Sequence, residues 1–147
     1  FDLIVLPVSL NAVPDVQPVW HECYRVLRRG GVLLVGLINP TLFLFEENDG
    51  SSPSRGLTVV NRLPYSEYES FSEDERRSAL ERGAVFLWSH SLSSLLGGQL
   101  AAGFVLTDLQ EAYRTDDRAP TLNEYCATYI ATRAMKAIER GQSHGAA

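Results

Sequence analysis

The sequence of 147 residues has little cysteine, little positive charge and no long apolar run. Its two cysteines, Cys23 and Cys126, lie far apart and outside any metal-ligand spacing, so we predict reduced thiols in a cytoplasmic protein and no metal site. Without a run of about 18 apolar residues, it has no membrane-spanning helix. A net charge of -5 excludes a general nucleic-acid binder, because phosphate contacts require a basic surface.

The sequence also lacks a glycine-rich phosphate-binding motif. The pairs Gly30-Gly31 and Gly97-Gly98 fit neither the dinucleotide-binding fingerprint nor the P-loop pattern. The histidines and serines form no catalytic triad that spacing can specify. What the chain does have is 45% apolar and 21% charged residues, the composition of a globular domain with a sizeable core. Function must therefore be sought in the order of its structural elements.

The first 40 residues predict a strand, a helix and a second strand. Phe1 to Val8 and Val32 to Ile38 are nearly continuous apolar runs, typical of parallel strands buried on both faces. Between them, Asp15 is the expected helix N-cap, and Gly30 is expected to end the helix in a left-handed conformation. This order predicts a right-handed βαβ crossover.

The middle of the chain departs from this pattern. Residues 39–56 are polar and rich in turn-forming residues, which predicts a loop. We interpret the span from Leu57 to His90 as an insertion. Within it, LTVVNRL predicts a short strand, SEDERRSALERG a solvated helix capped by Ser72 and closed by Gly83, and AVFLWSH an extended stretch.

After this span the α/β pattern resumes. Leucines at helical spacing predict a helix that Gly103 ends, and FVLTDLQEAY predicts a strand. Gly97 and Gly98 would cost that helix roughly 1 kcal/mol each, and such a pair is better tolerated where a helix approaches another backbone closely. The tail, residues 121–140, fits one face of a helix and one face of a strand, and the apolar pattern alone favours the helix.

The position of residues in the predicted sheet suggests where a ligand would bind. Ligands of open parallel sheets lie beyond the carboxyl ends of the strands. Asn11 follows the first predicted strand and Asn39 the second, although both are equally typical of turns. His90 ends an extended stretch just before a helix. Its favoured role is a structural hydrogen bond, and its functional alternative is contact with a substrate or acceptance of its proton.

A family resemblance extends this interpretation. FDLIVLPVSLNAVPDVQPVWHECYRVLRRGGVLLVGLINP resembles the second half of bacterial class I S-adenosylmethionine-dependent methyltransferases of the type 11 kind, and YRVLRRGG is its most specific piece. SHSLSSLLGGQLAAGFVLTDLQE is similar to the family's later helix and strand, and TYIATRAMK to its last strand. The resemblance covers nearly the whole chain.

The resemblance implies an α/β fold, namely the C-terminal half of a Rossmann-like sheet with strand order 4-5-7-6. Its last strand would be antiparallel and would lie near Thr128 to Met135, against the apolar pattern. Residues 57–90 would form a cap insertion. Residues 1–147 would form a partial domain, with the donor-binding half expected before Phe1.

The resemblance also implies roles for individual residues. The donor, S-adenosylmethionine, would be lined by residues after the first strand: Pro7, Val8, Ser9 and Leu10. The catalytic candidates are His90, which matches a histidine of many relatives, and Asn11, at a position that often carries His or Asp. The substrate-binding candidates are Asn39, Tyr65, Phe86 and Trp88, although aromatic residues at such places are more often core.

The implied activity is methyl transfer to a small-molecule acceptor by in-line displacement, in which the protein positions a nucleophile and excludes water. The chain alone would bind the donor poorly and be inactive. The alternatives are a non-catalytic α/β module for dimerisation or partner binding, and a nucleotide-binding oxidoreductase with another strand order. One edge of the strand Phe1 to Val8 would lack a neighbour, and Leu3, Val5 and Trp20 would be uncovered. We therefore expect a homodimer or other self-association through this strand.

Overall fold

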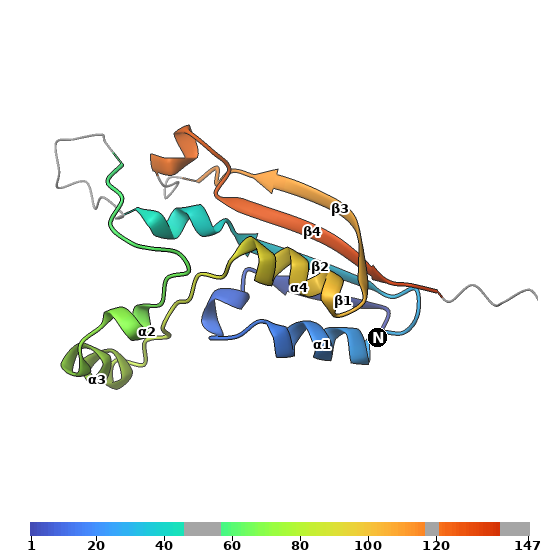
Figure 1. Cartoon of the computed structure of the whole chain (residues 1–147), viewed down its shortest axis with the longest axis horizontal. Helices are drawn as coiled ribbons and strands as arrows, with labels where there is room; N and C mark the ends of the chain where they lie inside the picture. Colours follow the sequence, from blue (N-terminus) through green and yellow to red (C-terminus); the bar gives the residue numbers. More distant parts are fainter. Residues whose placement is uncertain (46–56, 117–120, 139–147) are drawn as a thin grey trace, which may run out of the picture.

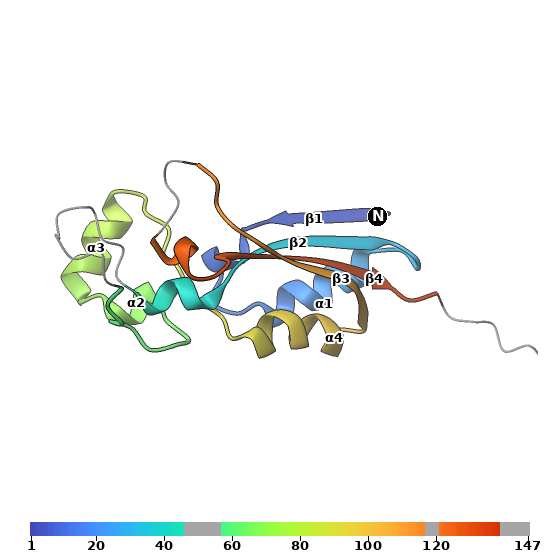
Figure 2. The same ribbon diagram turned by 90° about the horizontal axis from the view of Figure 1, so that it is seen from above.

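The computed structural model of the chain describes residues 1–45, 57–116 and 121–138. A four-stranded mixed sheet carries helices on one face, and a helical extension projects from one end (Figures 1 and 2). Strands β1 (Leu3–Pro7) and β2 (Val32–Ile38) are parallel, and β4 (Tyr129–Lys136) runs antiparallel between β2 and β3 (Phe104–Ala112). The order β1-β2-β4-β3 confirms the predicted order and excludes the oxidoreductase alternative.

The predicted βαβ unit is present, with helix α1 (Gln17–Val26) between β1 and β2. The helix begins after Val16, slightly later than expected, but the Asp15 carboxylate still accepts the Gln17 backbone N–H at 2.9 Å. Gly30 has a φ of 75°, the left-handed conformation predicted for it. From β4, the Lys136 Nζ donates to two carbonyls at the end of α1 and so joins the last strand to the first helix.

The second helix of this layer packs against α1 through a glycine. A π-helical turn (Ser93–Gly97) continues into α4 (Gly98–Ala101). A Cβ atom at Gly98 would lie 2.6 Å from Cδ1 of Trp20, whereas one at Gly97 would meet no atom within 4 Å. The expected close approach is therefore real at Gly98, although the neighbour is a side chain rather than backbone.

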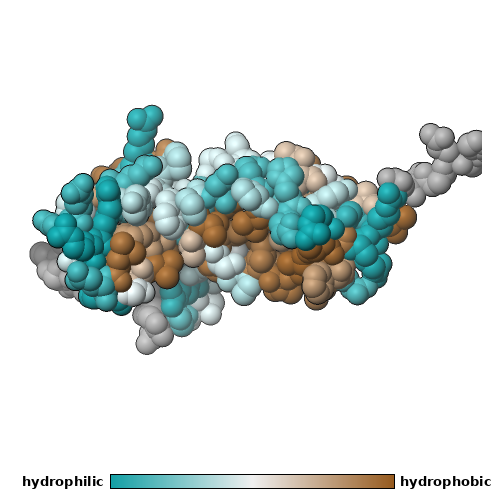
Figure 3. Space-filling view, turned by 90° about the horizontal axis from the view of Figure 1, so that it is seen from below, coloured by the Kyte–Doolittle hydropathy of each residue, from teal (hydrophilic) through white to brown (hydrophobic). Residues whose placement is uncertain are grey.

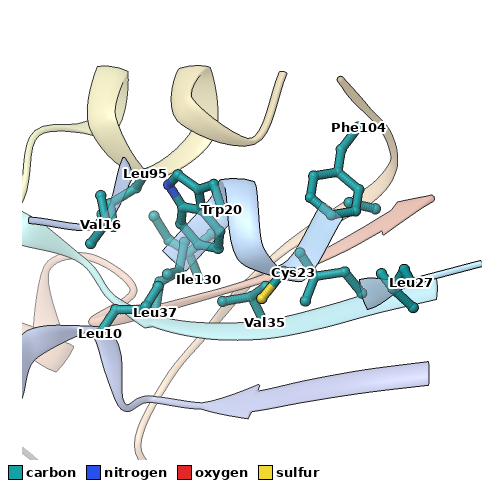
Figure 4. Packing of buried hydrophobic residues seen from close by; sticks show 12 residues of the cluster. Leu10, Val16, Trp20, Cys23, Leu27, Val35, Leu37, Leu95, Phe104 and Ile130 are labelled. Atoms are coloured by element: carbon teal, nitrogen blue, oxygen red, sulfur yellow. The ribbon is translucent and has the colours of Figure 1, made fainter. Parts of the chain in front are cut away.

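The apolar core lies between the sheet and these two helices (Figure 4). Trp20 is fully buried, and its Nε1 donates to the Ser94 carbonyl at 3.0 Å. The expectation that Trp20 is uncovered was wrong, because α4 lies over it. The other large buried core residues include Leu10, Val16, Leu27, Leu33, Val35, Leu37, Leu95, Phe104 and Ile130.

The opposite face of the sheet is bare. Leu3 and Val5 of β1 are 51% and 54% exposed, as the sequence led us to expect, and Leu34 and Val105 are also exposed. Within the described ranges no helix covers this face (Figure 2). Among the described residues, helices therefore cover only one of the two faces of the sheet.

The tail forms a strand, so the helix favoured by the apolar pattern was wrong. Ile130, Thr132 and Ala134 alternate toward the core, with at most 6% of their surface exposed, and β4 has a hydrogen-bonded neighbour on each side. As a central strand the segment forms hydrogen bonds along both edges and buries one face in the core. An isolated amphipathic helix would bury only its apolar face. A short 3-10 helix (Thr121–Glu124) precedes it, and residues 139–140 lie outside the described ranges.

Residues 57–90 project from the end of the sheet (Figure 1) and carry helices α2 (Glu67–Ser70) and α3 (Glu73–Glu81). The Ser72 cap was predicted correctly, and Glu75 completes a reciprocal capping box. The strand predicted for LTVVNRL was wrong. Val59 makes only an isolated bridge to Phe45, and its side chain is exposed, so no apolar face of this segment is buried as it would be in a strand. Of the predicted loop, residues 46–56 lie outside the described ranges.

Candidate functional site

The loop that follows β1 begins with an unusual backbone conformation. Val8 has a φ of 52°, a conformation that a β-branched residue adopts only under strain. Its N–H donates to the Gly36 carbonyl at 3.1 Å, and a Cβ atom at Gly36 would lie 3.2 Å from Val8 Cγ2. Gly36 therefore makes room for Val8. Strained conformations gather at functional sites, so this loop is a candidate on structural grounds alone.

The residues predicted to line the donor are divided by this turn. Pro7, Val8 and Ser9 are exposed at the carboxyl end of β1. Leu10 is only 3% exposed and begins a 3-10 helix (Leu10–Ala12) that belongs to the core. The first three side chains are accessible to a ligand, whereas Leu10 is buried in the core.

Asn11 and His90 lie together, although 79 positions separate them in sequence (Figure 1 shows their segments meeting at the end of the sheet). The Asn11 Nδ2 donates to the Trp88 carbonyl at 2.8 Å, and the Trp88 N–H donates to the Asn11 carbonyl at 2.8 Å. His90 Nε2 lies 3.0 Å from the Leu10 carbonyl. Both side chains therefore fasten the end of the insertion to the loop after β1.

This arrangement limits what His90 can do chemically. A carbonyl oxygen only accepts hydrogen bonds, so His90 Nε2 must carry the hydrogen in its contact with Leu10. Nδ1 is then the ring nitrogen left to accept a proton from a substrate. The same imidazole can thus bind the loop after β1 through Nε2 and act as a base through Nδ1, since the two ring nitrogens are separate groups.

Asn39 has structural partners on both sides of its amide. Its Nδ2 donates to the Ala127 carbonyl at 2.9 Å, and its Oδ1 accepts the Thr41 N–H at 3.1 Å, which caps a 3-10 helix (Pro40–Leu44). It therefore ties the end of β2 to the segment before β4. Any contact with a substrate would use the outer surface of this fixed amide.

A pocket of about 280 Å³, which we call the cap pocket, opens beside Trp88 and His90. Its walls come from residues 14–16 before α1, residues 64–66 and 69 within the insertion, and residues 88–91 and 94 at and after its end. Tyr65, Trp88 and His90 line it, so the structure brings three predicted site residues together. The walls also include the acids Asp15 and Glu69, which the sequence analysis did not select.

A second pocket of about 340 Å³, which we call the rim pocket, lies at the end of β2. It is lined by residues 39–41, 63–64 and 91–93, including Asn39. Pro64 and Ser91 line both pockets, so the two share a wall. No spacing rule could have joined these segments, because they meet only through the fold.

Phe86 does not line either pocket. It is 7% exposed and lies among the rings of the insertion, with centroids 5.3 Å from Tyr68, 5.9 Å from Phe71 and 6.5 Å from Trp88. The structure therefore places it behind Trp88, where it supports a pocket wall. Its predicted contact with a substrate stays a prediction.

Other reactive groups lie away from the pockets. Burial raises the pKa of the Cys23 thiol in the core, which keeps the thiol protonated and unreactive. Over residues 1–45, 57–116 and 121–138, no group of three or more His, Cys, Asp or Glu side chains is placed to hold a metal ion. None of the helices in these ranges is long and apolar enough to cross a membrane.

Known proteins resemble this chain in sequence and in fold. A methyltransferase domain family matches residues 1–35. The uncharacterized methyltransferase YbaJ of Bacillus subtilis (strain 168) is 38% identical over 92% of the chain and 51% of its own length, so the chain spans about half of that relative.

Solved structures agree on the fold. An S-adenosylmethionine-dependent methyltransferase from Mesorhizobium loti superposes with a TM-score of 0.62 at 16% identity, over 92% of this chain and 61% of its own. A Listeria monocytogenes protein provisionally assigned to the same class gives 0.61 at 12%, over 94% and 62%. The chain is therefore similar in sequence to about half of a methyltransferase, and its fold is that of the C-terminal half of a class I S-adenosylmethionine-dependent methyltransferase.

Proposed function

We propose that this chain supplies the acceptor side of an S-adenosylmethionine-dependent methyltransferase that acts on a small molecule. The observation that carries the proposal is the pair of pockets beside the strained loop after β1, where His90, Tyr65, Trp88 and Asn39 gather. Pockets of this size suit part or all of a small metabolite. The free Cys23 and Cys126 suit the cytoplasmic location that we also propose.

The residues at the end of β1 fit one side of the donor. Pro7, Val8 and Ser9 are exposed where ligands of open sheets bind, and Val8 is held in the strained conformation described above. When bound, S-adenosylmethionine supplies a methyl group activated by a sulfonium sulfur. Since the chain spans about half of its relative YbaJ, we assign the remaining donor contacts to sequence outside these 147 residues.

The chain's own residues would orient the acceptor and shield it from water. Tyr65 and Trp88 form walls of the cap pocket, and the hydrogen bonds between Asn11 and the backbone of Trp88 keep the second wall in place. His90 can accept the acceptor's proton at Nδ1 while Nε2 stays bound to Leu10. Positioning of this kind supplies much of the rate of a displacement reaction, because the reacting atoms start in line.

The proposal is tested by comparing this chain with the longest protein that its gene encodes. Isothermal calorimetry should show donor binding by the longer protein and none measurable by the 147-residue chain. In the longer protein, His90→Ala and Asn11→Ala should lower turnover while donor affinity stays nearly constant. Micromolar donor binding by the chain alone, or equal loss of donor affinity and turnover in both variants, would contradict the assignment.

A second candidate function is a non-catalytic module that pairs with another chain. The bare face of the sheet and the outer edge of β1 favour it, since Leu3, Val5 and Leu34 form an exposed apolar surface. Figure 3 looks toward the β1 edge and shows apolar surface along the half of the molecule that holds β1 and α1. An unpaired apolar strand recruits another strand, and we propose a homodimer through β1 as this partner.

Sedimentation velocity shows whether the chain is a dimer or a monomer in solution. A stable pairing should bury more than about 1,000 Å² and give a dimer at tens of micromolar. Val5→Lys on the bare face should weaken the dimer, whereas Tyr125→Lys, at an exposed position outside the strands, should leave it unchanged. A monomer at these concentrations, or equal effects of the two variants, would exclude the homodimer.

A further inference from the structure

We infer that the cap pocket and the rim pocket together bind one amphiphilic cation, with its ammonium group in the cap pocket and its hydrocarbon part in the rim pocket. The inference rests on the proposed function, because it names the chemical class of the acceptor. Its basis is the difference between the walls of two adjoining pockets, which no family assignment supplies.

The cap pocket selects positive charge. Asp15 and Glu69 both line it, and none of the lysines and arginines in the described ranges does so. Asp15 is held in place because its carboxylate accepts the Gln17 N–H, whereas Glu69 extends from the short helix α2 on the other side. Carboxylates that face a shared concavity concentrate the field of the protein and attract a cationic ligand.

Aromatic walls of the cap pocket add to this preference. Tyr65 and Trp88 both line it, and an ammonium group over either ring would gain a cation–π contact. Each wall is fixed through its backbone. The Tyr65 N–H donates to Ser89 Oγ at 2.7 Å, and the Ser89 N–H returns to the Tyr65 carbonyl at 2.8 Å. Trp88 is held by Asn11 in the same reciprocal way, so the pocket is formed before a ligand arrives.

The rim pocket offers a different surface. Its walls are Pro40, Leu63, Pro64 and Leu92 together with small polar residues, and none of the described charged side chains lines it. The Asn39 amide that lines it is already bound to Ala127 and Thr41. A polar ligand group would find few unused partners here, so a hydrocarbon chain fits this pocket better.

The shared wall makes one ligand sufficient for both pockets. Because Pro64 and Ser91 line both, a molecule with an ammonium head and a short hydrocarbon tail can occupy them together. His90 lines the cap pocket, so the charged head would lie on the same side as the proposed base. An acceptor nitrogen there would need to lose a proton before methylation, and Nδ1 is the His90 ring nitrogen that the contact with Leu10 leaves to accept it.

Three probes of equal chain length test the inference by direct binding to the 147-residue chain: hexylammonium, hexanol and hexanoate. Calorimetry at low salt should show hexylammonium binding roughly tenfold more tightly than hexanoate, with hexanol between them. Raising the salt concentration should weaken hexylammonium binding and leave hexanol binding unchanged, because only the charged contact is screened.

A pair of matched variants locates the charge that matters. Glu69→Gln removes a carboxylate from the cap pocket, whereas Glu73→Gln makes the same change outside both pockets, in the first turn of α3. The first should weaken hexylammonium binding about three- to fivefold and leave hexanol binding unchanged, and the second should change neither.

Each outcome decides the question. Equal binding of the three probes, no binding at millimolar concentration, or equal effects of the two variants would overturn the inference. Cation binding by the chain without methyl transfer by the longer protein would leave the inference standing and reject the proposed function. Methyl transfer only to uncharged acceptors would do the reverse.

Discussion

The sheet and the insertion are held together in different ways. The sheet has continuous ladders and one apolar core, in which Trp20, Leu33 and Leu37 are almost completely buried. The insertion makes isolated bridges, a capping box and a cluster of rings around Phe86. The sheet therefore depends on burial, which tolerates conservative change, and the insertion on particular hydrogen bonds, which do not.

This difference separates stability from shape. A change in the sheet should unfold the whole molecule, because the strands and the helices that pack on them contribute to one shared core. A change in the insertion should alter the pockets first, because residues 63–66, 69 and 88–90 form part of their walls. Substitutions in each region can test this division.

The largest effect is expected from Trp20→Ala in the sheet's core. The indole is fully buried and bound to Ser94, so its removal should leave a cavity and cost about 3–5 kcal/mol of unfolding free energy. Urea denaturation followed by circular dichroism measures this loss. Tyr125→Ala, at an aromatic residue that is 67% exposed, is the matched control and should change stability little. Loss of the insertion alone in Trp20→Ala would break the comparison.

Neighbouring glycines give the next effect. Gly98→Ala would place a Cβ atom 2.6 Å from a Trp20 side chain that cannot move, and should cost about 1–3 kcal/mol. Gly97→Ala would meet nothing within 4 Å and should stabilise the helix by up to about 1 kcal/mol. Thermal melting compares the two, and the same sign for both substitutions would show that α4 does not pack as described.

A smaller and local effect is expected from His90→Ala in the insertion. The change removes one of two hydrogen bonds to the Leu10 carbonyl, which the Val13 N–H also reaches at 3.3 Å, and should cost about 1 kcal/mol, mainly in the fastening of the insertion. Hydrogen exchange should become faster at the amides of Trp88 and Ser89 and stay slow in β2. His21→Ala, at an exposed histidine, is the control. Uniformly faster exchange would place His90 in the sheet's core instead.

The smallest effect concerns pH at the start of α3. Hydrogen bonds from the Ser72 hydroxyl and backbone N–H hold the pKa of the Glu75 carboxyl below its ordinary value of about 4.5. The capping box therefore contributes its stability above that value and loses it as the pH falls through the lower, folded pKa. Carboxyl NMR titration measures this pKa, and Ser72→Ala should raise it toward the ordinary value. An unchanged pKa in that variant would contradict the capping role.

The sequence was informative where burial follows a simple period. The continuous apolar runs of β1 and β2 and the capping residues Ser72 and Gly30 could be read directly. The last strand could not, because residues such as Ile130 and Ala134, which share one face of the strand, are also spaced to share one face of a helix. Only pairing on both sides decides between them, and pairing is a long-range property.

The candidate site was predictable only in part. The ends of the strands directed attention to Asn11 and Asn39, but the partners of Asn11 and His90 lie nearly 80 residues away in sequence. The acids of the cap pocket carry no local signal, since Asp15 reads as a helix cap. The strain at Val8 is also invisible in sequence, although a glycine within a strand, Gly36, hints at a close backbone approach.

The place of β4 in the sheet has a consequence for the time at which the molecule can fold. This strand lies between β2 and β3 and is the partner of both, yet it leaves the ribosome after both of them. Until residues 129–136 have been made, β3 lacks its partner β4, and β2 exposes the edge that β4 later covers. Lys136, which caps α1, arrives at the same moment. The nascent chain must therefore wait with apolar strands uncovered, and chaperones or slow translation would matter most in that interval.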